Sequence, residues 1–271
     1  MILRKLLIAV ICLLSACLVA APGSAAQGQA AVPSGSQADG MAILMRTANF
    51  LAQAGQFSFR LSAGYDVLQE TGQKIEFGEV RQVTLVRPDR MRVDTERSDG
   101  EKAQAIFNGQ EIIVYSPGDK VYATAGKPGD LDSALRYLVN DLQLRLPLSL
   151  MYVRDFPAEL ERRMLSVDVV EKVAAMDVPC IHLAGRTDTV DFQFWIPTEG
   201  DPLPRRVVMT YKLAEGQPQF WANFTEWNLS PNPPQGFFSF TPPEGVQRIA
   251  FLAELEVAKP DVKKVKKGGK K

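Results

Sequence analysis

The sequence predicts a mainly β protein of the α+β class, with one antiparallel sheet that curves into an open or incomplete barrel of about eleven strands. Three observations lead to this prediction. Apolar and polar residues alternate with period two along most of residues 56–227, and turn signals separate the alternating runs. One insertion, Leu131 to Met164, instead follows a helical pattern. No β-α-β rhythm is present, so neighbouring strands should pair antiparallel, and their accumulated twist should curve the sheet.

The first predicted element is a helix from Asp39 to Gly55, with Asp39 as its N-cap and Gly55 as its end. From Gln56 the period changes to two, and between Phe57 and Val67 every second residue is apolar or aromatic. This alternation predicts a strand with one buried face and one face in water.

Strand signals continue on both sides of the helical insertion. Before it they cover Lys74–Val86, Arg90–Thr95, Glu101–Phe107, Glu111–Tyr115 and Lys120–Ala125. After it they cover Leu165–Val173, Pro179–Arg186, Thr189–Ile196, Leu203–Tyr211, Phe220–Trp227 and a short Phe237–Thr241. Asn108-Gly109 marks a tight hairpin, because both residues tolerate positive φ.

The insertion is predicted to cover the inner face of the curved sheet. Leu131, Ala134, Leu135, Leu138 and Leu142 recur at helical spacing, so they would form one apolar stripe on a helix. A sheet closed in this way either has a packed core or encloses a cavity, and the choice between the two decides what the protein does.

The residues predicted to face the interior have large apolar or aromatic side chains. On the strands they are Phe57, Phe59, Leu61, Tyr65, Phe192, Phe194, Val207, Met209 and Phe220, and on the insertion they are Leu131, Leu135, Leu138 and Leu142. Acyl chains need a dry surface of this kind, which they bury with a gain of about 0.8 kcal/mol per methylene. Periodicity alone favours the other interpretation, a well-filled core.

The two ends of the chain carry separate signals. Residues 1–26 have the charge, apolar run and small residues of an export signal peptide, and residues 27–38 read as a flexible linker before the domain at 39–251. Cleavage after Ala26 is one interpretation. The other is a lipoprotein signal, in which Cys17 is acylated and anchors the mature protein. Both interpretations predict a periplasmic location.

Charge is distributed unevenly along the chain. The formal net charge is zero, yet residues 6–253 carry 22 basic and 28 acidic side chains, and seven lysines lie between Lys259 and Lys271. The acidic body is unsuited to nucleic acid. Residues 252–271 are predicted to be a disordered Lys-rich tail, which either contacts an anionic membrane surface or serves only to increase solubility.

Catalytic signals are nearly absent. His182 is the single histidine, and Cys180 would be the single cysteine of the mature chain, so the usual zinc sites and catalytic triads have no support. No phosphate-binding glycine motif occurs. Acidic pairs such as Asp188 with Asp191, or Glu159 with Glu161, would suit a hydrolase but are expected by chance. We therefore predict a protein that is not an enzyme and has no cofactor or metal.

Three short motifs carry a family resemblance. They are Arg87-Pro88 at the end of a strand, Asn108-Gly109 followed by Ile112, Tyr115, Ser116 and Pro117, and the late run Phe238–Val246. In this order they resemble the periplasmic lipoprotein carriers and acceptors with the LolA/LolB-like fold. The span from about Asp39 to Phe251 is more similar to an uncharacterised family of predicted periplasmic proteins. The resemblance implies an eleven-stranded antiparallel half-barrel around helices that plug or cover an apolar cavity.

The resemblance also implies a role for Arg87, which by position would hold the lid helices until acyl chains displace them. Its five donors suit helix carbonyls, although an exposed arginine at a strand end is an equal interpretation. The leucine-rich insertion and the lysine tail depart from the carriers. We expect a protein that binds a lipid, an acylated protein or another apolar ligand. The alternative is an envelope sensor or assembly module, with a filled core and a protein partner.

Overall fold

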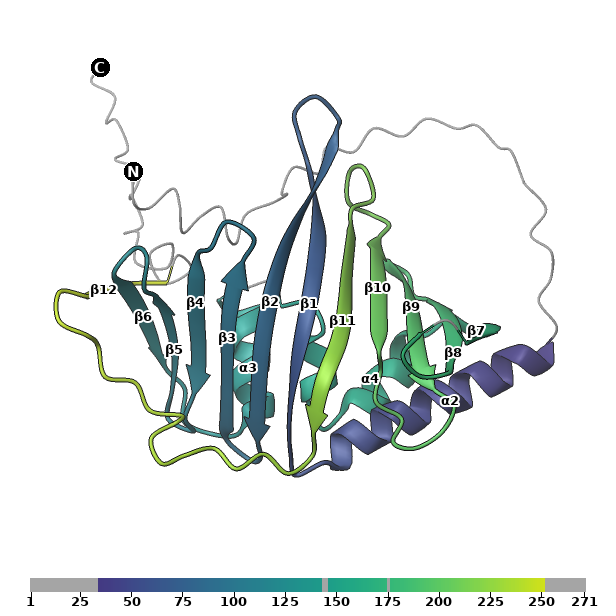
Figure 1. Ribbon diagram of the computed structural model, residues 1–271, viewed down its shortest axis with the longest axis horizontal. Coiled ribbons are helices and arrows are strands. Elements are labelled where there is room, and N and C mark those ends of the chain that lie inside the picture. The colour runs from purple at the N-terminus through teal and green to yellow at the C-terminus, as the bar shows by residue number, and fades with distance from the viewer. Residues whose placement is uncertain (1–33, 143–145, 175, 252–271) are drawn as a thin grey trace, which may run out of the picture.

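The computed structural model describes residues 34–142, 146–174 and 176–251. Within these residues, one twelve-stranded sheet curves around a set of helices (Figure 1). The helices are α2 (Ser34–Gln53), α3 (Leu131–Asn140), the 3-10 helix η1 (Ser149–Tyr152) and α4 (Phe156–Arg163). None of the helices in the described ranges is long and apolar enough to cross a membrane. Cys17, the export signal and the Lys-rich tail lie outside the described residues.

The sheet is built from sequence neighbours. Its strands are β1 (Gln56–Leu68), β2 (Lys74–Val86), β3 (Arg90–Arg97), β4 (Lys102–Phe107), β5 (Glu111–Ser116), β6 (Val121–Gly126), β7 (Ser166–Val173), β8 (Cys180–Arg186), β9 (Val190–Pro197), β10 (Arg206–Tyr211), β11 (Gln219–Asn228) and β12 (Gln247–Ile249). They are ordered β12-β6-β5-β4-β3-β2-β1-β11-β10-β9-β8-β7. Strands β1 to β11 pair antiparallel with their neighbours. Among the described strands, β12 alone pairs parallel, with β6. The predicted open antiparallel half-barrel is confirmed.

Turn chemistry fixes the strand register where the sequence indicated it. At the hairpin between β4 and β5, the side-chain Oδ1 of Asn108 accepts hydrogen bonds from the backbone N–H groups of Gln110 and Glu111, both at 3.0 Å. Gly109 has φ of 85°, and a Cβ at this position would collide with the carboxylate of Asp89. Glycine is therefore required here for both its backbone conformation and the space it leaves.

Helix α2 begins earlier than predicted. It starts at Ser34, so Asp39 is a residue within the helix rather than its N-cap, and the last part of the predicted 27–38 linker is helical. The helix ends at Gln53, two residues before Gly55. Within it, a Cβ on Gly40 would collide with the carbonyl oxygen of Val167, so the missing side chain lets α2 lie against the backbone of β7.

Within its described residues, the insertion contains the short helices α3, η1 and α4, and the predicted apolar stripe lies on α3 except for Leu142. Asp130 caps α3, because its Oδ1 accepts a 2.9 Å hydrogen bond from the N–H of Ser133. The helix ends at Asn140. The prediction that Leu142 lies on this helix is therefore wrong, although the side chain of Leu142 is buried. Helix α4 follows with Pro157 in its first turn, where a missing N–H costs nothing.

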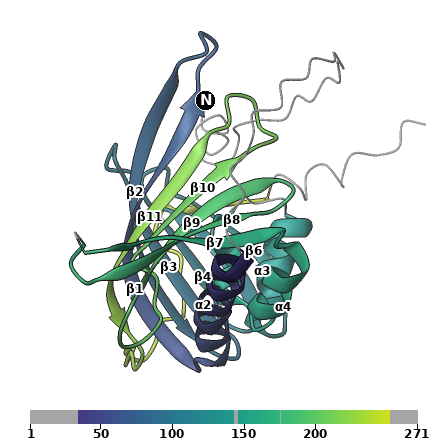
Figure 2. The same cartoon turned by 90° about the vertical axis from the view of Figure 1, so that its right-hand side faces the viewer.

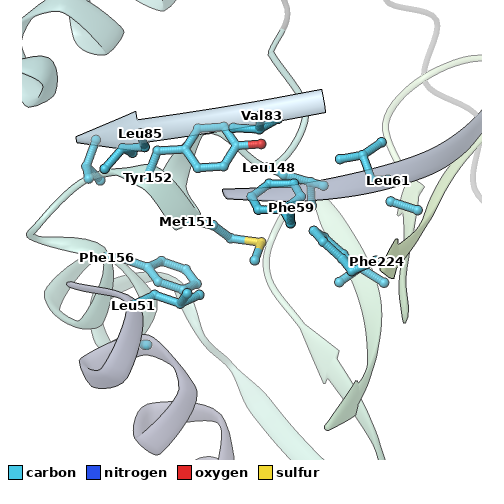
Figure 3. Packing of buried hydrophobic residues seen from close by; sticks show 14 of the residues in the cluster. Leu51, Phe59, Leu61, Val83, Leu85, Leu148, Met151, Tyr152, Phe156 and Phe224 are labelled. Carbon is cyan, nitrogen blue, oxygen red and sulfur yellow. The ribbon is translucent and has the colours of Figure 1, made fainter. Parts of the chain in front are cut away.

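Helices α2, α3 and α4 all lie on the concave side of the sheet (Figure 2). The core lies between them and the strands, and Figure 3 shows part of it. Leu51 and Phe156 come from the helices, whereas Phe59, Val83 and Phe224 come from β1, β2 and β11. The inner apolar face that the alternating pattern predicts is thus buried by the elements predicted to cover it.

Residues 229–251, here called the C-terminal strap, leave β11 and follow one end of the strands to the far edge of the sheet (Figure 1). The predicted strand Phe237–Thr241 is wrong, because these residues form turns and irregular backbone. Prolines on both sides remove backbone donors that a ladder would need. The aromatic rings instead cover the outer face, where Phe240 lies 5.2 Å from the ring of Tyr115 and 5.4 Å from that of Tyr122.

Candidate functional site

The predicted lining residues come together on the concave side as a packed core. Those that are buried are Phe57, Phe59, Leu61, Leu131, Leu135, Leu142, Phe192, Phe194, Val207 and Phe220. Tyr65, Leu138 and Met209 are partly buried against the same clusters. The strand register explains why these side chains lie together, because Leu61 is paired with Phe224 and Val207 with Phe194. Side chains that alternate on paired strands point to one face.

Helix side chains fill the interior between the sheet and the helices. The ring of Tyr152 from η1 lies 6.3 Å from that of Phe59 and is stacked on it (Figure 3). Burial raises the pKa of Tyr152 to about 12, against a lowering by Arg81, while Glu79 raises it further. The phenol is therefore neutral and held in an apolar setting.

Two shallow, open hollows occur among the described residues, and neither is lined by the predicted residues. One, of about 320 Å³, lies between α2 and the strands β7 and β8, and is lined by Asp39, Ala42, Ile43, Val169, Lys172 and Ile181. The other, of about 330 Å³, lies at the end of α2 and is lined by Phe50, Gln53, Ala54, Gly55, Gln56 and Leu229.

Arg87 joins the helices to the sheet. It directly follows β2, and its side chain is only 2% exposed. Its Nε donates a 3.1 Å hydrogen bond to the carbonyl of Ala54, just after α2. Its Nη1 lies 3.5 Å from Oδ1 of Asp132, in the first turn of α3. Burial lowers the pKa of Arg87, partly offset by Asp132, but an arginine keeps its charge in proteins.

Further hydrogen bonds extend this contact, here called the Arg87 clasp, to the rest of the insertion. The other carboxylate oxygen of Asp132 accepts a 2.9 Å bond from the N–H of Arg154, just before α4. The N–H of Leu131 donates to the carbonyl of Pro88 at 2.8 Å. Nη2 of Arg87 is buried without a hydrogen-bond partner among the described residues. The clasp therefore links β2, α2, α3 and the segment before α4 at one point.

Only the family resemblance identified Arg87 as a candidate from the sequence. Asp132 and the carbonyl of Ala54, which accept its hydrogen bonds, were not identified. Asp132 could have been noticed as an acidic residue in the first turn of a helix, where it is favourable to the helix dipole. Nothing local in the sequence shows that it meets Arg87, 45 residues earlier. The carbonyl of Ala54 carries no sequence signal at all, because every residue has one.

A second, smaller apolar cluster lies under the C-terminal end of α3. It contains Ala123 and Ala125 of β6 with Leu142 and Phe251, and Tyr137, Leu138, Val114 and Ile249 pack around it. Phe251 is 9% exposed and belongs to the C-terminal strap. Sequence reasoning placed Leu138 and Leu142 in the interior but did not foresee that the strap supplies their partner.

The residues considered for chemistry lie apart from this concave face. His182 is on the convex side, where its ring is stacked 4.2 Å from that of Trp195 and its Nε2 is 2.9 Å from Oε1 of Gln193. Cys180 is buried, and burial raises the pKa of its thiol. Asp191 pairs with Lys212 at 3.0 Å. No group of three or more His, Cys, Asp or Glu suited to a metal occurs within the described residues.

Comparisons with solved structures find similar chains of low sequence identity. Lipoprotein LppX of Mycobacterium tuberculosis is 10% identical, with 72% of this chain and 98% of that chain covered and a TM-score of 0.46. The LolA superfamily protein NE2245 of Nitrosomonas europaea is 11% identical, with 74% and 97% covered and a TM-score of 0.37. MucB of Pseudomonas aeruginosa, solved in complex with MucA, is 17% identical, with 75% and 61% covered and a TM-score of 0.39.

The chain thus spans about three fifths of the length of that MucB chain. The comparison with curated proteins found no match. A family model matches residues 40–252, which is most of the chain and nearly the whole sheet and its helices. The model describes a predicted periplasmic protein, in agreement with the resemblance carried by the sequence motifs. The chain therefore belongs to the DUF2092 family of predicted periplasmic proteins.

Proposed function

We propose that this protein binds a lipid, the acyl chains of a lipoprotein or a similar apolar ligand on the concave face of its sheet, in place of the helices that now cover it. The observation that supports the proposal is the way in which helices cover the concave face. It consists of short helices packed on an apolar face and joined to the end of β2 through the Arg87 clasp. On this proposal, the helices packed on the concave face represent its closed form.

The energies involved are compatible with exchange of helices for a ligand. An acyl chain of about fifteen methylenes gains about 12 kcal/mol on burial, at about 0.8 kcal/mol for each. A hydrogen bond to a charged group contributes about 1.5–3 kcal/mol, so a clasp of two such bonds is smaller than this gain. The ligand also keeps the concave face dry after the helix side chains leave, which offsets the part of the opening cost that comes from exposing the strand side chains.

Arg87→Leu tests the proposal, because it removes the clasp while retaining an apolar stem. We expect the variant to bind a fluorescent fatty-acid probe at least about tenfold more tightly than the unmodified protein, since less free energy opposes opening. Arg60→Leu is the matched control, because Arg60 is exposed on the outer face of β1. It should leave probe affinity unchanged.

The result that contradicts the proposal is no probe binding by either variant or by the unmodified protein, with circular dichroism showing that all three are folded. That outcome would favour the second candidate, an envelope module that binds a protein partner. The filled interior supports this alternative, as do Leu165 and Val170 at the β7 edge of the sheet, which are 63% and 53% exposed.

A further inference from the structure

The inward-facing residues of β2 change from apolar to charged part of the way along the strand. Glu79 is paired with Ala63 of β1, and Arg81 is paired with Leu61. Directly opposed residues on antiparallel strands project to the same face, and Leu61 and Ala63 belong to the main core. Glu79 and Arg81 therefore lie on the concave face, where they form an ion pair. The apolar surface that includes Val83 ends at this pair.

The ion pair lies at the boundary between the covered and the open parts of the concave face. Val83, the neighbouring inward residue on one side, is fully buried. The side chains of Arg81 and Glu79 are 19% and 9% exposed, and beyond them Phe77 and Ile75 are exposed. Figure 1 shows the hairpin of β1 and β2 extending beyond the helices. A ligand chain that replaced the helices would therefore end beside the ion pair.

A phenol from each layer lies near the ion pair. Burial raises the pKa of Tyr65 on β1, and Glu79 and Arg81 also act on it. Burial likewise raises the pKa of Tyr152 on η1, which the same two charges influence and which Figure 3 shows beside Val83. Tyr65 is on a strand, so it stays in place when the helices move. We call Glu79, Arg81 and Tyr65 the polar band.

The charges around the polar band disfavour an ionised head group. Arg81 is paired with Glu79. Arg97 lies opposite Glu79 on β3 and pairs with Asp99 at 3.2 Å and with Glu101 at 3.0 Å. These five side chains carry two positive and three negative charges. A carboxylate or phosphate would therefore compete with carboxylates for both arginines, and an ammonium would lie beside the guanidinium of Arg81.

An uncharged ester or amide avoids both conflicts. A guanidinium has five N–H donors, so the pairing of Arg81 with one carboxylate leaves donors for a carbonyl oxygen. The phenol of Tyr65 can donate as well. Removing a charge from water without its own partner costs far more free energy than burying an ester or amide that accepts a hydrogen bond. The polar band is thus suited to an uncharged carbonyl group.

We propose that the polar band binds the uncharged ester or amide group of an acylated ligand, whose acyl chain lies along the concave face toward Leu61 and Val83. The carbonyl oxygen accepts hydrogen bonds from Arg81 and Tyr65, while the ion pair with Glu79 stays intact. The inference rests on the proposed function, because it names the chemical class of that ligand and its direction on the sheet. Ionised amphiphiles such as free fatty acids bind more weakly.

Isothermal titration calorimetry with three ligands that share one chain tests this preference. Oleate, glyceryl monooleate and oleylamine are each supplied to the purified full chain from a cyclodextrin complex, at a mildly alkaline pH where oleate is ionised. The unmodified protein should bind the monoester at least about tenfold more tightly than either ionised ligand. This order needs no variant, so the inference stays testable should a substitution prevent folding.

Two substitutions of the ion pair should shift the preference in opposite directions. Glu79→Gln leaves Arg81 without its carboxylate and should strengthen oleate binding at least about tenfold, whereas Arg81→Gln should strengthen oleylamine binding by a similar factor. A merely structural role would change all three affinities together. Glu96→Gln is the matched control, because Glu96 is exposed on the outer face of β3, where it pairs with Lys102 at 3.5 Å. It should leave all three affinities unchanged.

Separate outcomes contradict the two proposals. The polar band is rejected if the unmodified protein prefers oleate or oleylamine to the monoester, or if both ion-pair variants are folded by circular dichroism and keep the original order of affinities. Equal binding of all three ligands would also reject it, while the proposed function would stand. No binding of any of the three to the folded protein would remove the proposed function, and the polar band with it.

Discussion

At the scale of single residues, the structure separates two leucines that the sequence treats alike. Leu135 is 4% exposed in the main core, whereas Leu138 is partly buried beside the second cluster. We expect Leu135→Ala to lower the free energy of unfolding by about 3 kcal/mol and Leu138→Ala to lower it by about 1 kcal/mol, because the larger loss of packing follows deeper burial. Urea unfolding measures both, and equal losses would show that the two sites are packed alike.

At the scale of elements, the cap of α3 should make stability depend on pH. The hydrogen bond from the N–H of Ser133 holds the pKa of Asp130 below its usual range. When folding lowers the pKa of a carboxyl group, its charged form stabilises the folded state. This contribution is fully present above the pKa of the unfolded state, near 4, and it is lost as the pH falls through the pKa of the folded state. Asp130→Ala should therefore cost about 1 kcal/mol at neutral pH and little in acid. The exposed Asp188, changed to Ala, is the control and should leave the free energy of unfolding at neutral pH unchanged.

At the scale of the whole molecule, the sheet and its helical cover should respond differently to a ligand. The strands β1, β2 and β11 form the centre of a continuous twelve-stranded sheet, whereas α3, η1 and α4 are short and are joined through the Arg87 clasp. We expect a bound fatty acid to accelerate hydrogen exchange in the three short helices while the central strands stay protected. Uniform slowing throughout the protein would instead indicate binding to the closed form.

The strand pattern was predictable because a residue's face in a sheet follows from its place in the sequence. Phe57, Phe59 and Leu61 alternate with polar residues, and all three are buried as expected. The boundaries of α2 were not predictable in the same way. Asp39 has the side chain of an N-cap, yet the helix continues through it to Ser34, and Gly40 is used for close packing against β7 rather than as a break.

The antiparallel sheet, the helical cover and the apolar face between them were predictable from the sequence, because they follow from local periodicity and turn chemistry. The folded arrangement was needed to show that side chains pack this face, that Arg87 meets Asp132 and the carbonyl of Ala54, and that Phe251 lies under α3. Such contacts join residues far apart in the chain, and a periodic pattern gives the direction of a side chain without giving its partner or the volume left beside it.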